Sequence, residues 1–285
     1  MSTEQHGSVT PYFVPEPNIW PNVINVGIFL LLLGFVLKIN DLGGAIADSL
    51  LMLSGTAVLL IGAFAWIADV ASENKRGLFK PWEERSFRIG MAFFIFAELM
   101  FFAAFIGSLM YVRVFSLPWL HIQGLNPGFM GSWPSGLEGK AVTALDPFGV
   151  PLFNTVLLLC SSISLLWANA GIAQDNRGKM FQGLIVTLLL GVGFLFMQVN
   201  EYGHAATEFG LLMSSGAYGT MFYMLTGFHG VHLLVGLIIV ATILVRALRG
   251  HFSADNYFGV KGTGWYWNYI VVVPGLLVYI YFYLI

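Results

Sequence analysis

Long apolar runs separated by shorter polar segments set the pattern of this 285-residue chain. At a rise of about 1.5 Å per residue, a run of about 20 apolar residues crosses a bilayer as an α-helix. The runs are continuous and show no alternation of polar and apolar positions, so we expect helices rather than barrel strands. The predicted spans are Val23–Ile39, Ala45–Val70, Phe87–Arg113, Pro151–Ile172, Met180–Tyr202, Ala217–Leu248 and Thr263–Ile285.

The segments between the spans predict one all-α membrane domain over residues 1–285, with no separate soluble domain. Asn40–Gly44 predicts a tight turn between the first two helices. Residues 114–150 hold several prolines and glycines, and we expect an irregular loop there. In chain order, the predicted parts are a polar lead along the inner membrane surface (1–21), a two-helix hairpin (22–70), a cytoplasmic loop (71–86) and a five-helix bundle (87–285).

The basic residues predict how the spans are oriented. Lys and Arg concentrate in short cytoplasmic loops, and here they favour the side that holds the N-terminus. The chain is therefore predicted to run N-in and C-out, with the loop 114–150 on the periplasmic side. The basic residues on the inner side are Lys75, Arg76, Lys80, Arg85, Arg88, Arg177, Lys179, Arg246, Arg249 and Lys261, and those on the outer side are Lys38, Arg113 and Lys140.

Composition supports a membrane protein and excludes several other classes. The chain is 57% hydrophobic and 10% charged, whereas soluble domains carry about 25% charged residues. The formal net charge of -2 gives no sign of nucleic-acid binding. Cys160 is the single cysteine, so neither a disulfide nor a cluster of thiolate ligands is expected.

Glu98 is the candidate with the clearest chemical interest, because it is the one charged residue of its predicted span between the Arg88 and Arg113 ends. An ionised carboxylate at membrane depth costs at least a few kcal/mol. Burial favours the neutral acid, so we expect Glu98 to be protonated and to find a partner on another helix. We weigh an idle, neutral carboxyl against a proton-related role and favour the latter, since such residues are rarely without function. The residues of its own helix face cannot pair with it: Phe94, Ile95, Phe101, Phe102 and Phe105.

His229 and His232 are the predicted partners, because they lie three residues apart near the middle of the sixth span. Neutral imidazole is also a common metal ligand. A metal needs three or four ligands, however, and Cys160 is the only further candidate at membrane depth. We therefore favour hydrogen bonding over metal or haem ligation at this pair.

The remaining candidates lie near the predicted membrane surfaces. Glu201 and His204, at the outer end of the fifth span, are interpreted as interfacial residues that reach headgroups or water. Arg246 and Arg249 end the sixth span on the inner side. They are ordinary flanking charges or, alternatively, a clamp for a lipid phosphate. Trp66, at the inner end of the second span, is a belt aromatic or an acyl-chain contact.

Several motifs, taken in order, resemble subunit III of the haem–copper cytochrome c oxidases. The resemblance covers nearly the whole chain from the second span onward. The histidine motif Gly227-Phe228-His229-Gly230-Val231-His232 together with Trp265-Tyr266-Trp267 is highly specific for that family. The other matching segments are Phe96–Phe102 around Glu98, Val150–Thr155, Trp167-Ala168, Gln198–Tyr202, Tyr218–Thr220, Gly236 and His251-Phe252.

This resemblance implies a seven-helix membrane bundle, split into two plus five helices by a V-shaped cleft that holds phospholipid. It implies a non-redox subunit with no catalytic residue, haem or metal of its own, since haem and copper belong to the partner subunits. The implied partners are oxidase subunits I and II, structural phospholipids and, indirectly, cytochrome c. The implied place is the bacterial cytoplasmic membrane, in a proton-pumping oxidase of aerobic respiration. The family's carboxyl and lipid contacts fall on Glu98, Trp66, Arg246 and Arg249.

The chain departs from the family pattern at two places. Asn74–Pro81 lacks the usual Gly-His-Thr element, and Asn268–Val271 lacks the His and Asp that usually follow the Trp-Tyr-Trp motif. Within the family, a quinol-oxidase subunit or a homologue associated with nitric oxide reductase remains an alternative, although the first two spans favour the cytochrome c enzyme. An independent proton-coupled carrier is the alternative of another class, and it should show discontinuous helices around a midplane site.

Overall fold

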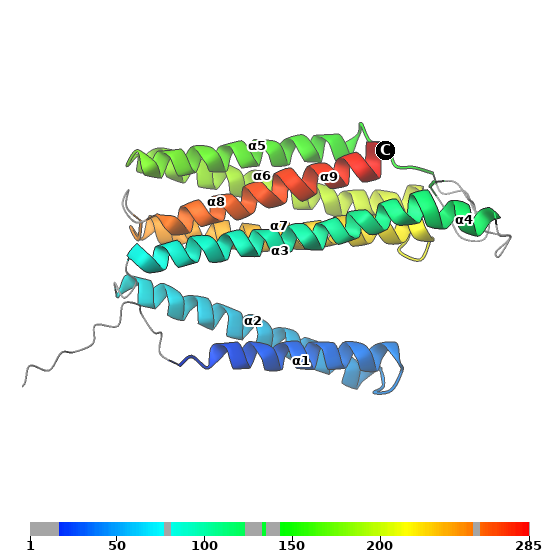
Figure 1. The fold of residues 1–285 in the computed structure, drawn as a ribbon, viewed down its shortest axis with the longest axis horizontal. Coiled ribbons are helices and arrows are strands. Elements are labelled where there is room, and N and C mark those ends of the chain that lie inside the picture. The colour runs from blue at the N-terminus through cyan, green and yellow to red at the C-terminus, as the bar shows by residue number, and fades with distance from the viewer. Residues whose placement is uncertain (1–16, 77–80, 123–132, 135–142, 253–256, 285) are drawn as a thin grey trace, which may run out of the picture. The chain divides into compact units, whose positions relative to one another are not determined.

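Helices make up most of the computed structural model, which describes residues 17–76, 81–122, 133–134, 143–252 and 257–284 (Figure 1). Within these ranges no strand occurs. Seven helices are long and apolar enough to cross a membrane, which confirms the predicted seven-helix class. The elements are α1 (Trp20–Ile39), α2 (Ala45–Lys75), α3 (Pro81–Tyr111), η1 (Val112–Ser116), α4 (Leu117–Ile122), α5 (Val150–Ala173), α6 (Arg177–Glu208), α7 (Ala217–Leu248), α8 (Phe258–Ile270), η2 (Val271–Gly275), α9 (Leu276–Val278) and η3 (Tyr279–Leu284).

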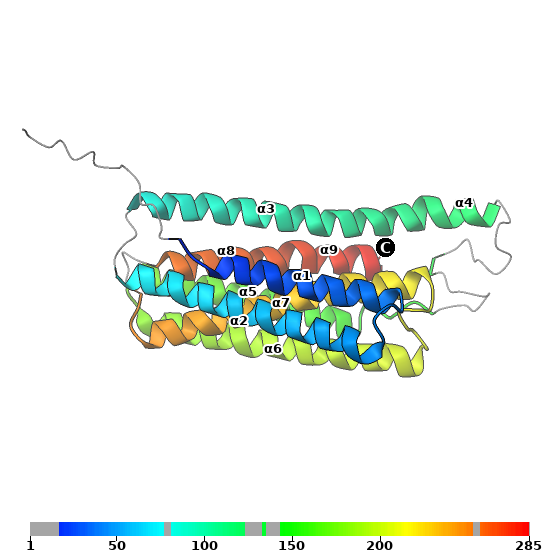
Figure 2. The same cartoon turned by 90° about the horizontal axis from the view of Figure 1, so that it is seen from below.

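The chain divides into two compact units, residues 1–87 and 88–285. In the first, α1 and α2 form an antiparallel hairpin (Figures 1 and 2). Their backbones approach closely at glycines: a Cβ built on Gly27 would lie 2.6 Å from the Leu59 nitrogen. The turn between the helices uses positive φ angles, 53° at Asp41 and 74° at Gly44. This hairpin agrees with the turn predicted at Asn40–Gly44.

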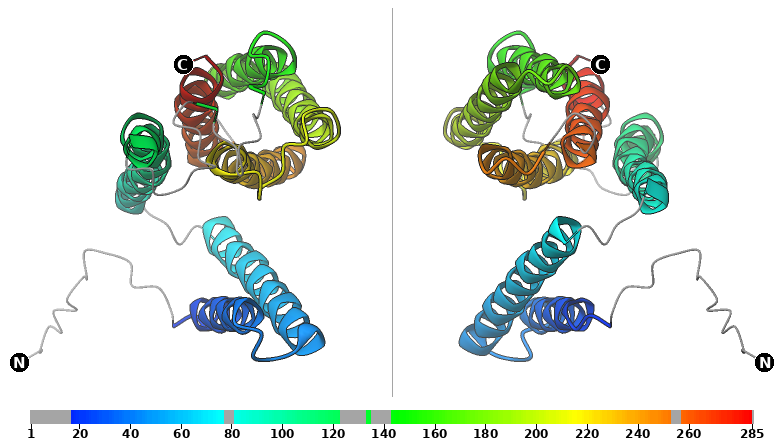
Figure 3. Two further views of the ribbon diagram at one scale, coloured as in Figure 1. Left: turned by 90° about the vertical axis from the view of Figure 1, so that its right-hand side faces the viewer. Right: turned by 90° about the vertical axis from the view of Figure 1, so that its left-hand side faces the viewer.

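In the second unit, α5, α6, α7 and the C-terminal segment from α8 to η3 form a ring when seen end-on (Figure 3). Trp267 of α8 is completely buried at its centre. Its ring lies against two glycines, since a Cβ on Gly191 or Gly236 would come within 2.9 Å of it. Its Nε1 donates to Ser161 Oγ at 3.0 Å. The Trp-Tyr-Trp motif and Gly236 therefore belong to one packing arrangement.

Helix α3 lies against α7 and α8 mainly through aromatic side chains. Phe94 contacts Tyr266 with ring centroids 5.8 Å apart, and Phe101 contacts Phe228 at 5.3 Å. Phe102 is almost fully buried in this contact. Phe94, Phe101 and Phe102 therefore face the neighbouring helices and hold Glu98 near them.

Two predictions about loops are wrong in part. The predicted irregular loop 114–150 begins with helix, because η1 and α4 carry the third span on to Ile122. Pro118 cannot donate a backbone hydrogen bond, and the wider π-type turn of η1 just before it accommodates this gap without ending the helix. The segment between α2 and α3 is shorter than the predicted loop 71–86, because α2 continues to Lys75 and α3 begins at Pro81.

Several helices extend beyond the predicted spans at their polar ends, most clearly α6, which runs from Arg177 to Glu208. Apolar character marks the part of a helix that lies in lipid, whereas backbone hydrogen bonding continues into polar residues. The predicted N-terminal lead falls mostly outside the described residues, as do Lys80, Lys140 and Ile285.

Candidate functional site: a carboxyl–histidine pair and a buried polar cluster

Glu98 of α3 and His232 of α7 face one another in the second unit. His232 Nε2 lies 2.8 Å from Glu98 Oε2, and less than a fifth of either side chain is exposed. The distance is that of an ion pair, although the angle at the ring falls outside the range of a regular hydrogen bond. The structure thus brings together the carboxyl and one of its two predicted partners.

The other ring nitrogen of His232 decides how protons can be shared in this pair. Nδ1 lies 2.7 Å from the Phe228 carbonyl oxygen, which can only accept, so Nδ1 carries a hydrogen. A neutral His232 then has a lone pair at Nε2, facing the Glu98 oxygen. The contact thus brings a carboxyl oxygen, which can carry a proton, to 2.8 Å from a ring nitrogen that can accept one.

Aromatic rings surround the pair and keep its environment apolar. The His232 ring lies 5.5 Å from the Phe101 ring and 5.1 Å from the Phe102 ring, between centroids. On α8, the Tyr266 hydroxyl donates to the His232 carbonyl oxygen at 3.1 Å. The two groups therefore face each other in surroundings of low polarity, where interactions between polar or charged groups are stronger than in water.

His229, the second predicted partner, does not contact Glu98 and has a different role. Its Nε2 lies 3.1 Å from the Ile270 carbonyl oxygen, so this nitrogen donates. In a regular helix that carbonyl would accept from the residue four positions on, which is Pro274 and has no N–H. His229 therefore supplies the donor that Pro274 lacks, at the point where α8 passes into η2. The sequence contains both residues, but only the fold shows that they are linked.

A second polar cluster, which sequence reasoning missed, lies among α5, α6 and α7. Asn154 and Gln198 are buried, and within the described structure both Asn154 amide atoms and Gln198 Nε2 make no regular hydrogen bond. A buried polar group without a partner costs about 1–3 kcal/mol. Thr226 nearby accepts from the Tyr202 hydroxyl at 2.9 Å. The sequence pattern could have indicated this cluster, because Asn154 and Gln198 are polar residues within apolar spans, as Glu98 is.

Glu201 and His204, both predicted to be interfacial, differ in exposure. Glu201 is only 6% exposed, because α6 continues for two turns beyond it and neighbouring side chains cover it. It therefore does not reach water as predicted. His204 is exposed and forms an ion-pair contact with Glu208, at 3.2 Å from Nδ1 to Oε1. Sequence patterns did not indicate this difference, since it depends on where the helix ends.

The lipid-binding candidates lie in different units. Arg246 is partly buried, and its guanidinium lies over the Phe252 ring, 5.0 Å from the ring centroid. Arg249 ends α7 and is exposed. Trp66, in α2 of the first unit, is 42% exposed. The two arginines share one end of α7, where guanidinium groups could bind a phosphate.

The first residues that depart from the family pattern after the Trp-Tyr-Trp motif have contacts of their own. Ser162 Oγ donates to Asn268 Oδ1, and Asn268 Nδ2 donates to the Gly264 carbonyl oxygen at 2.7 Å. Asn268 thus joins α8 to α5. Tyr269 is buried beside it, and its hydroxyl has no hydrogen-bond partner among the described residues.

Comparison with known proteins agrees with this arrangement. The family model described as "Cytochrome c oxidase subunit III" matches residues 10–285. Among similar curated proteins, each named cytochrome c oxidase subunit 3, that of Rattus norvegicus is 33% identical over 264 residues. Those of Gadus morhua and Dugong dugon are 32% and 31% identical over 263 residues. In all three cases the match covers 92% of this chain and 92% of the relative.

Proposed function

The chain belongs to the cytochrome c oxidase subunit III family, and from this premise we propose that it is the non-redox third subunit of a proton-pumping terminal oxidase. Membership makes it a multi-pass membrane protein and a subunit of an oxidase complex. The proposed task is to stabilise the catalytic subunit, to support proton uptake and to sustain turnover. The observation that carries this proposal is the match over nearly the whole chain, including the segment around Glu98.

The Glu98–His232 pair gives the proposed proton role a chemical basis. A single proton held by the pair at rest is part of the proposal, and the close approach of Glu98 Oε2 to His232 Nε2 supports it. Gain or loss of a proton would leave a net charge among the aromatic rings, where charge is costly. Such a site favours transfer through the pair over storage of charge, so it can modulate proton uptake without performing oxygen chemistry.

The histidine contacts support a chain without its own redox centre. His229 Nε2 binds the Ile270 carbonyl, and both ring nitrogens of His232 already have partners. A metal at His232 or at His229 Nε2 would have to displace these contacts. We therefore assign haem and copper to oxidase subunits I and II, the proposed partners of this chain.

Binding of a phospholipid headgroup is proposed at Arg246 and Arg249 of the second unit. A contact with an acyl chain is proposed separately at Trp66 of the first unit. Two guanidinium groups at the inner end of α7 supply donors for a phosphate. The proposed membrane is the bacterial cytoplasmic membrane, and the proposed electron donor of the complex is cytochrome c, in keeping with the names of the relatives. Family membership takes precedence over the alternative of an independent carrier.

The test compares the intact oxidase complex carrying Glu98→Gln with the wild type. The amide can donate to His232 Nε2, so assembly, haem spectra and the initial rate of oxygen consumption should be retained. Proton uptake, the yield of pumped protons or the number of turnovers before inactivation should fall severalfold. Glu208→Gln is the matched control, because Glu208 is exposed and pairs only at the surface, and it should leave all readouts unchanged. Loss of initial oxygen reduction in a fully assembled Glu98→Gln complex would contradict the proposal.

A further inference from the structure

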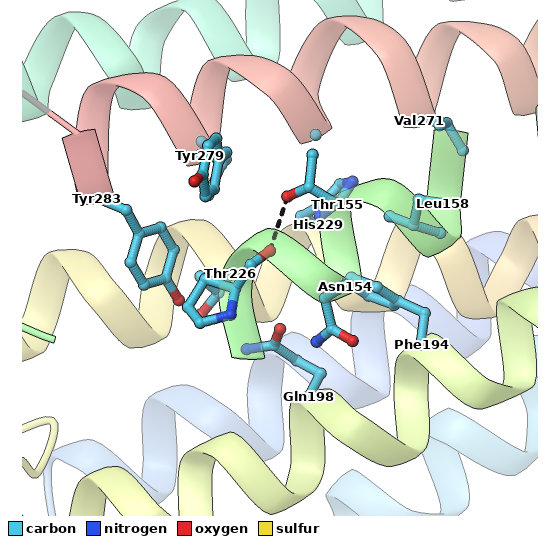
Figure 4. Close-up of a pocket in the computed structure, with 13 residues that line it drawn as sticks. Asn154, Thr155, Leu158, Phe194, Gln198, Thr226, His229, Val271, Tyr279 and Tyr283 are labelled. Atoms are coloured by element: carbon cyan, nitrogen blue, oxygen red, sulfur yellow. Dashed lines mark hydrogen bonds between the residues drawn. The ribbon is translucent and has the colours of Figure 1, made fainter. Parts of the chain in front are cut away.

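A cavity of about 40 Å³ lies inside the second unit, between α5, α6, α7 and the C-terminal segment (Figure 4). It is separate from the Glu98–His232 pair. Its residues are Pro151, Asn154, Thr155, Leu158, Phe194, Gln198, Thr226, His229, Val271, Gly275, Val278, Tyr279 and Tyr283. The volume is enough for a few water molecules.

Two buried amides line this cavity with unused hydrogen-bonding capacity. Asn154 is 3% exposed and Gln198 is 9% exposed. Within the described part of the chain, Asn154 Nδ2 and Oδ1 have no hydrogen-bond partner, and Gln198 Nε2 lies close to the Tyr202 hydroxyl but in a geometry outside that of a regular hydrogen bond. These atoms offer donors and an acceptor to the same space (Figure 4). Buried polar atoms in native proteins nearly always have a partner, so the cavity should contain one.

The hydroxyl groups around the amides can accept further hydrogen bonds. Thr155 Oγ1 donates to the Pro151 carbonyl at 2.9 Å, and the Tyr279 hydroxyl donates to the Pro147 carbonyl at 3.1 Å. Each has used its one hydrogen and keeps lone pairs. A ligand that fits must therefore donate to these oxygens and also accept from the amide nitrogens.

The charge of the lining narrows the class of ligand. None of the described lining residues is an aspartate, glutamate, lysine or arginine, so nothing there offsets the desolvation of an ion. An acyl chain would leave the amide atoms unsatisfied. The remaining class is a small, neutral molecule that both donates and accepts hydrogen bonds, and water is the molecule of that size.

We propose that this cavity is a water-binding site, in which a cluster of ordered waters joins Asn154 of α5 to Gln198 of α6. The waters bridge α5 and α6, because the side-chain amides of Asn154 and Gln198 do not bond to each other directly. They also reach Thr226 of α7 and Tyr279 of the C-terminal segment, so the cluster ties together the elements of the ring. The proposal does not depend on the proton role of Glu98.

The direct test is a density map of the intact complex at a resolution that shows ordered water. Water peaks are expected within hydrogen-bond distance of the Asn154 amide and of Gln198 Nε2. Continuous density of an alkyl chain, an empty cavity, or a direct bond between the two amides would overturn the proposal. Under xenon pressure the cavity should bind no xenon, because xenon enters dry apolar cavities, and a xenon peak there would also overturn it.

A substitution gives a second test, because the change in thermal stability should have opposite signs for a water-filled and a dry cavity. If waters satisfy Asn154, then Asn154→Leu removes their anchor and should lower the thermal stability of the complex. If the amide is dry and unpaired, the same change removes an unsatisfied group and should raise stability, which would contradict the proposal. Leu158→Met, on the apolar wall of the cavity, is the control and should leave the water peaks in place.

Discussion

At the scale of single residues, Glu98 and His229 show two ways in which the bundle accommodates polar groups at membrane depth. Glu98 faces His232, with 2.8 Å between Oε2 and Nε2. His229 contacts the Ile270 carbonyl, at the point where Pro274 supplies no backbone donor. The two histidines of one motif therefore have different contacts: His232 pairs with Glu98, for which we propose a proton role, and His229 bonds to the backbone of the C-terminal segment.

Glu98 should be the carboxyl of this chain that reacts first with a hydrophobic carbodiimide. These reagents attack neutral acids and concentrate in apolar surroundings, and Glu98 faces His232 beside the rings of Phe101 and Phe102 in a membrane-spanning segment. The measurement is peptide mass spectrometry of the labelled complex. Glu201→Gln, a change of a glutamate that is only 6% exposed, should leave labelling intact, and Glu98→Gln should abolish it. Preferred labelling at Glu201 would show that the neutral acid has been assigned to the wrong residue.

The sequence predicted Glu98 because one charged residue in an apolar span is conspicuous. It narrowed the partner to two histidines but did not distinguish them, since both lie on nearly the same helix face. Asn154 and Gln198 were missed because uncharged amides are less conspicuous among apolar residues. Glu201 was assigned to the surface because the span was ended six residues too early, at Tyr202 rather than Glu208.

At the scale of elements, proline and π-type turns explain how two spans remain helical. Pro118 follows η1, and Pro274 lies within η2. In both cases the wider turn accommodates a missing backbone donor, so the helix continues in nearly the same direction. Sequence patterns predicted the existence of every span and its approximate centre. They did not predict helix ends, because these depend on backbone hydrogen bonds in polar segments.

The link between His229 and Pro274 predicts a measurable coupling. His229→Phe removes the donor to the Ile270 carbonyl and should cost about 1–3 kcal/mol of stability. Pro274→Ala restores a backbone N–H for the Ile270 carbonyl. In the Pro274→Ala variant, His229→Phe should therefore lower stability by less than in the wild type. The coupling energy from thermal unfolding of the four variants should be about 0.5–3 kcal/mol. His229→Gln is the control, because its amide can still donate. Additive effects would contradict the link.

At the scale of the whole molecule, the chain consists of a glycine-packed hairpin and a larger helical unit. The first unit ends at Phe87, within α3. Lipid-binding candidates occur in both units. We propose that bound phospholipid strengthens the attachment of this subunit to its complex.

Replacing both Arg246 and Arg249 by alanine should weaken phospholipid retention and loosen the subunit from its complex. Basic residues at an anionic membrane surface contribute about 1 kcal/mol each, so the pair accounts for about 2 kcal/mol. The measurement is the phospholipid content and subunit ratio of complexes purified with and without added lipid. The defect should appear mainly without added lipid. Arg177→Ala and Lys179→Ala, changed together at the start of α6, form the matched control. An equal loss of phospholipid and of the subunit in the two double variants would contradict a specific lipid site at α7.

Co-purification tests the central claim most directly. An affinity tag on this chain, mild detergent and mass spectrometry identify the proteins that accompany it, and an absorption spectrum reports their haem. The account predicts this chain in equal amount with oxidase subunits I and II, a haem signal from the complex, and no haem on the chain once it is separated. Isolation of the chain alone, or with partners that carry no haem, would contradict its assignment as an oxidase subunit.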